Sequence, residues 1–64
     1  MTHDIIIESI GQDGSVEWRE TITAASKSAA RRKANSLVRS TGETTTIDKR
    51  VNQYDSSIEM WTLK

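Results

Sequence analysis

The chain has 64 residues, of which nine are Lys or Arg and nine are Asp or Glu, so its formal net charge is zero. A chain of this length predicts one domain with a small core, and it offers little depth for the water-excluding pocket that an enzyme needs. It has no cysteine and no 18-residue apolar run, so the sequence excludes a disulfide framework, a thiolate metal site and a membrane-spanning helix.

Residues 4–24 predict a β-hairpin. The segment 4–10 is rich in isoleucine and typical of a strand. Residues 11–14 contain two glycines and Asp13, which favour a turn. Residues 15–24 then alternate, with one face formed by Val16, Trp18, Ile22 and Ala24. His3 precedes this hairpin, and we expect it to lie in a frayed terminus.

Residues 26–40 predict one helix. Ser26 is suited to the N-cap, where its hydroxyl accepts from the backbone N–H of Ser28 or Ala29, and Gly42 is suited to the left-handed position after the helix. At about 100° per residue, one face is mostly alanine and carries Ala30, Ala34, Leu37 and Thr41, flanked by Val38. We therefore expect the helix to lie close on a sheet.

Residues 43–63 predict a second hairpin, with a Thr-rich strand over 43–52, turn residues from Asn52 to Ser56, and a last strand over 57–63. The predicted fold is α+β, in the order ββαββ, with an antiparallel four-stranded sheet and one helix packed on one face.

The zero net charge conceals a segregated distribution. Residues 21–42 contain five cations and no acid, whereas residues 1–20 sum to −4 and residues 43–64 to −1. Opposite the alanine face, Arg32, Asn35 and Arg39 form a stripe, with cations on both flanks. The candidate partner-binding residues are Lys27, Arg31, Arg32, Lys33, Asn35 and Arg39.

Separated charge attracts partners even when the total is neutral. The forked donors of arginine suit carboxylates and phosphates, so the expected partner is an acidic protein surface, a nucleoprotein complex or nucleic acid phosphates. The basic segment contains no aromatic residue on which a single strand could stack. The alternative interpretation is a helix face that is only solvated.

A second candidate surface is apolar. The first and last strands carry apolar residues on both faces, and one helix covers only one face of the sheet. We therefore expect Ile6, Trp61 and Leu63 to line an open face on which two copies associate into a homodimer, because a short chain gains stability from such contact.

No catalytic constellation is present in the sequence. The serines of the helical segment lack a histidine base, and the oxygen ligands around Asp13 do not recur as a calcium loop requires. We expect no catalytic residue, no cofactor, no metal and no membrane partner. The N-terminus lacks the cationic and apolar pattern of a signal peptide, so the expected location is the cytoplasm.

The order of hairpin, basic helix and hairpin resembles small phage-encoded host-defence inhibitors, including some anti-CRISPR proteins. The resemblance covers the whole chain, and its most suggestive part is the segment from Ser26 to Ala34. It implies a non-enzymatic protein that occupies a surface on a nucleoprotein complex. The residues leave two other interpretations open: a sequence-nonspecific nucleic-acid-binding module, and a structural or accessory homodimer whose helix is solvated.

Overall fold

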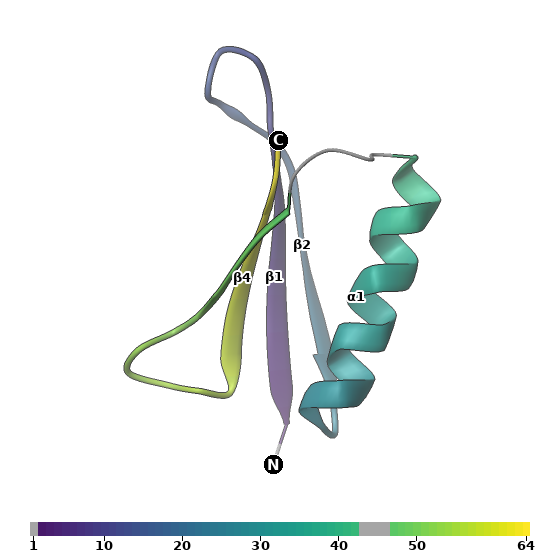
Figure 1. Cartoon of the computed structure of the whole chain (residues 1–64), viewed down its shortest axis with the longest axis vertical. Coiled ribbons are helices and arrows are strands. Elements are labelled where there is room, and N and C mark those ends of the chain that lie inside the picture. The colour runs from purple at the N-terminus through teal and green to yellow at the C-terminus, as the bar shows by residue number, and fades with distance from the viewer. Residues whose placement is uncertain (1, 43–46) are drawn as a thin grey trace.

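The protein folds as one sheet with one helix beside it (Figure 1). This computed structural model describes residues 2–42 and 47–64. The elements are, in chain order, β1 (His3–Ile10), β2 (Val16–Ala24), α1 (Lys27–Thr41), β3 (Ile47–Val51) and β4 (Ile58–Leu63). An α+β fold with four strands and one helix is therefore confirmed. The first part of the predicted strand over 43–52, up to residue 46, lies outside the described residues.

The prediction of an antiparallel sheet is wrong, because the sheet is mixed. Its strand order is β2-β1-β4-β3. The two hairpins β1–β2 and β3–β4 are antiparallel as predicted, but the central strands β1 and β4 are parallel. Figure 1 shows the reason, because each element runs in the direction opposite to the one before it. β2 and β3 therefore run opposite to β1, whereas α1 and β4 run in the same direction as β1.

The central strands are the two that are apolar on both faces. Ile5 and Ile7 of β1 are fully buried, and Trp61 of β4 is buried directly beside Ile7 in the parallel register. Ile6 points to the other face and is half-buried.

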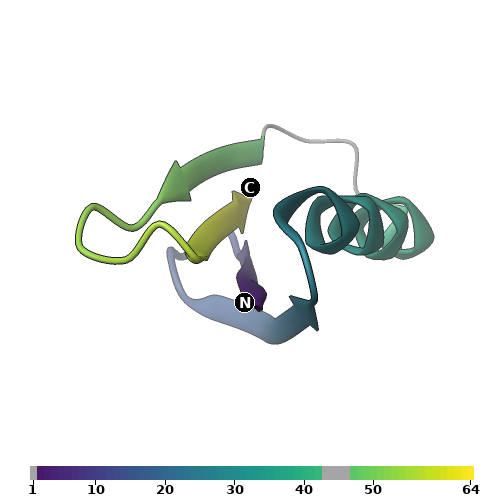
Figure 2. The same cartoon turned by 90° about the horizontal axis from the view of Figure 1, so that it is seen from below.

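Viewed from below, the sheet curves, and α1 lies on the inner side of the curve near β2 (Figure 2). One face of the sheet is thus covered by the helix and the other is not.

The alanine face of α1 packs on the sheet as predicted. Ala30 and Ala34 are completely buried against β1 and β2. Val38, rather than Leu37 or Thr41, completes this contact: Val38 is buried, Leu37 is half-buried and Thr41 is exposed. The small side chains permit a close approach of the helix to the isoleucines of β1.

The ends of α1 and the first turn also form as the sequence indicates. The Ser26 hydroxyl accepts from the Ala29 N–H at 3.2 Å. Gly14 and Gly42 adopt left-handed backbone angles, with φ of 84° and 75°, that glycine tolerates best. The pairing of β1 with β2 also contains a register shift between Ser9 and Ile10, and beyond it Val16 is exposed, whereas Trp18 and Ile22 pack against the core.

The close contact of α1 with the sheet leads to a prediction about overpacking. Ala34→Leu inserts a large side chain where none fits, so we expect the free energy of unfolding to fall by about 1–3 kcal/mol. Ser36→Leu, at an exposed position of the same helix, is the matched control and should change it by no more than about 0.5 kcal/mol. Chemical denaturation measures both. Equal stability of the two variants would show that α1 does not dock by this face.

Candidate macromolecule-binding surface on the helix

The six residues predicted to bind a partner lie together on α1 and are all exposed. The capped, 15-residue helix holds them at fixed spacing, and its alanine side faces the sheet. Arg32 and Arg39 therefore point away from the core, with Lys33 on one flank and Lys27 and Arg31 on the other. We call these six residues the outer helix face: Lys27, Arg31, Arg32, Lys33, Asn35 and Arg39.

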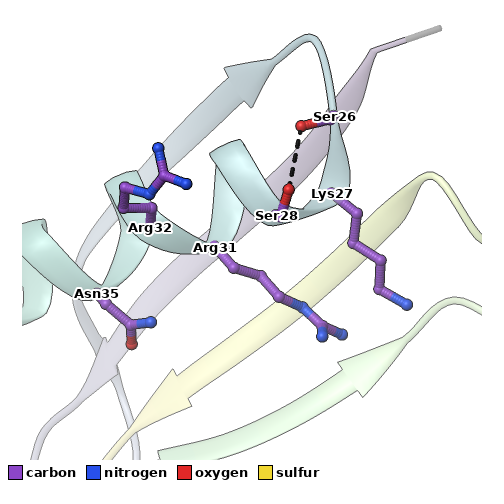
Figure 3. A pocket seen from close by; sticks show the side chains of 6 residues that line it. All are labelled: Ser26, Lys27, Ser28, Arg31, Arg32 and Asn35. Atoms are coloured by element: carbon purple, nitrogen blue, oxygen red, sulfur yellow. Dashed lines mark hydrogen bonds between the residues drawn. The ribbon is translucent and has the colours of Figure 1, made fainter.

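The first half of the outer helix face borders a shallow hollow of about 660 Å³ (Figure 3). Lys27 and Arg31 extend together toward β4, whereas Arg32 extends to the opposite side of the helix. The hollow is lined by Ser26, Lys27, Ser28, Arg31, Arg32 and Asn35. Four of the six predicted residues thus meet at one place, while Lys33 and Arg39 lie on the same helix outside the hollow.

Arg31 differs from the other cations because a buried carboxylate holds it. Its Nε donates to Oε1 of Glu59 at 2.9 Å. The Arg31 side chain is 45% exposed, whereas that of Glu59 is 1% exposed. The buried partner restricts the guanidinium to one orientation, and the exposed fraction leaves part of the group available for a partner.

Glu59 also accepts hydrogen bonds from two buried side chains. The His3 Nε2 lies 2.8 Å from Oε1, and the Trp61 Nε1 donates to Oε2 at 3.1 Å. An ionised carboxylate only accepts, so the histidine ring nitrogen is the donor. The expectation that His3 is frayed is therefore wrong: it is the first residue of β1, pairs with Ala24 and is 5% exposed. Pairing within a sheet and a buried acceptor fix this terminus.

The hydrogen bonds determine the charge state of Glu59. Burial by itself would raise the pKa of this carboxyl. The donors Trp61, Arg31 and His3 outweigh that effect, so the pKa of Glu59 lies below its ordinary value of 4.5. The carboxylate is consequently ionised at neutral pH despite its position in the core.

A further cation approaches the same cluster from β3. The Nζ of Lys49 lies 4.3 Å from the centre of the Trp61 ring. Lys49 and Trp61 are also register partners between β3 and β4, so the ammonium group covers the ring from the sheet edge. Trp61 is thus enclosed by the core on one side and by a cation on the other.

The predicted self-association surface does not form as expected. Ile6 does lie on the uncovered face of the sheet. Trp61 and Leu63, however, are buried on the opposite, helix-covered face, with 0% and 1% exposure, so their assignment to an open face is wrong. The alternation of β4 left two choices for the buried side, and in the structure the side that carries Trp61 and Leu63 joins the core with Ile5 and Ile7. Ile6 instead borders a hollow of about 320 Å³ with Arg50, Val51, Asn52, Ile58 and Met60.

The described part of the chain contains no group of three or more His, Cys, Asp or Glu side chains arranged to hold a metal ion. Within residues 2–42 and 47–64, no helix has the length and hydropathy needed to cross a membrane. No protein-family model matches the sequence, and no curated protein matches it.

Sequence reasoning missed the cluster around Glu59, although a signal for it was present. Glu59 alternates with Ile58 and Met60 and therefore shares the face of Trp61 and Leu63. An acid on the apolar side of a strand requires a partner, since a buried charge without one is costly. Arg31 and His3 satisfy that requirement from distant parts of the chain.

The cluster predicts how stability depends on pH. Because the pKa of Glu59 is lower in the folded state, its ionisation contributes stability above pH 4.5 that is lost as the pH falls through the folded value. We expect Glu59→Gln to cost about 1–3 kcal/mol at pH 7 and to flatten the decline of the unfolding midpoint below pH 4.5.

Two other carboxyls also make stability depend on pH under acidic conditions, because hydrogen bonds from Ser15 and Ser57 lower the pKa of Asp13 and Asp55. Both remain in the variant, so the difference between its pH profile and that of the wild type isolates Glu59. Asp48→Asn, which breaks the exposed pair with Arg50, is the control and should cost about 0–1 kcal/mol. Parallel pH profiles of the wild type and Glu59→Gln would contradict the role of the buried carboxylate.

Proposed function

We propose that this is a non-enzymatic binding protein that docks the outer helix face on an acidic macromolecular surface. The observation that supports the proposal is the concentration of five cations, with no acid, on one exposed helix. A protein whose charges served only solubility would mix both signs over its surface. Occupation of a nucleoprotein complex, as in the phage inhibitors that the chain resembles, is one form that such binding takes.

Three of the nine acids are paired or buried away from the outer helix face. Glu8 pairs with Arg19, and Asp48 pairs with Arg50, on the sheet face that points away from α1. Glu59 is buried and already holds Arg31. The cations on the far face are thus compensated locally, and the outer helix face retains most of its charge for a partner.

Charge reversal tests the proposal. The double variant Arg32→Glu/Arg39→Glu should abolish capture of the native partner from a cell extract, because both side chains are exposed and opposite the core. The fold should be intact by circular dichroism. Capture should also weaken as salt rises, since exposed charges are screened beyond about 8 Å at physiological ionic strength.

The matched control is Arg19→Glu/Arg50→Glu, which changes the net charge equally but acts on the far face of the sheet. It should retain capture. If both double variants bind as well as the wild type, the charge on α1 is only solvated and the proposal is wrong. If both lose binding equally, net charge rather than the outer helix face is responsible.

A further inference from the structure

We infer that the partner of the outer helix face is the phosphate backbone of B-form DNA, with α1 seated in the major groove without sequence preference. This inference rests on the proposed function and specifies its partner.

The first observation that supports the inference is the absence of large apolar side chains from the outer helix face. The large apolar side chains that are exposed in the described part of the chain are Val16, Val51 and Tyr54, and α1 carries none of them. Protein interfaces depend on aromatic or aliphatic anchors at their centre, whereas contacts with phosphates need only cations.

The second support is the arrangement of the cations around the helix. Arg32 and Arg39 lie opposite the buried alanines, Lys33 lies on one flank, and Lys27 and Arg31 lie on the other. Figure 3 shows Lys27 and Arg31 on the β4 side of the helix and Arg32 on the opposite side. A helix in the major groove has a phosphate row on each side, so cations on both flanks match both strands. The polar side chains Ser28 and Asn35 lie between the flanks and allow the helix to enter.

The shape of the molecule permits this approach. In Figure 2, α1 stands at the side of the molecule, and the β3–β4 loop points away from it. The helix has 15 residues and is about 22 Å long, which corresponds to roughly two thirds of a DNA turn. The major groove of B-form DNA is about 12 Å wide and admits one helix.

The same features argue against other nucleic acids. A single strand binds by stacking its bases on aromatic side chains, but Trp61 is buried and Tyr54 lies in the β3–β4 loop, away from α1. The major groove of an RNA duplex is deep and narrow, so side chains do not reach into it. B-form DNA is therefore the polyanion whose geometry matches the outer helix face.

The test uses a DNA duplex of about 20 base pairs and random sequence, with binding followed by fluorescence anisotropy over a salt series. With four or five phosphates neutralised, log K should fall against log salt with a slope of about −4, which is a loss on the order of 10²-fold between about 50 and 200 mM. Lys27→Gln and Lys33→Gln, one on each flank, should each reduce the slope by about 1. Arg50→Gln, on the far face of the sheet, is the control and should leave it unchanged.

Each of the following results would overturn the inference. Equal affinity for an RNA duplex, or a slope that responds to only one flank, would exclude a helix seated in the major groove. Absence of DNA binding, together with nuclease-resistant capture of a protein that Arg32→Glu/Arg39→Glu abolishes, would refute DNA as the partner and leave the proposed function intact. Failure of the wild type both to bind DNA and to capture a partner would refute both.

Discussion

The buried carboxylate of Glu59 is the interaction on which the arrangement of this small domain depends. Its three donors come from three elements: His3 from β1, Arg31 from α1 and Trp61 from β4. A packing that buried this charge without these donors would cost several kcal/mol. The cluster therefore selects one arrangement among those that the apolar residues alone would allow, because isoleucines and alanines pack without directional preference.

The position of the helix follows from this cluster and from the alanine face. Alanine lets α1 approach β1 and β2, and the Arg31–Glu59 pair links the helix to β4 when the alanine side faces the sheet. This orientation places Arg32 and Arg39 opposite the core. The chain has no cysteine and therefore no disulfide to hold the helix in this position.

The same contacts separate the charges of the folded protein. Strand acids pair with strand cations at Glu8–Arg19 and Asp48–Arg50, and the buried acid pairs with the one helix cation that reaches it. The remaining cations of α1 face solvent. The charge of the surface that we propose for binding thus depends on the pairing of acids with cations within the sheet, as well as on the basic composition of the helix.

The sequence by itself determined the local structure. The caps at Ser26 and Gly42, the turn at Gly14 and the two hairpins all follow from interactions between residues that are close in the chain. Tertiary structure decided the rest. The parallel contact of β1 with β4, the burial of Trp61 and Leu63, and the pairing of His3 and Arg31 with Glu59 join residues that are far apart in the chain. Alternation in a strand shows which residues share a face, but only packing against the helix decides which face is covered.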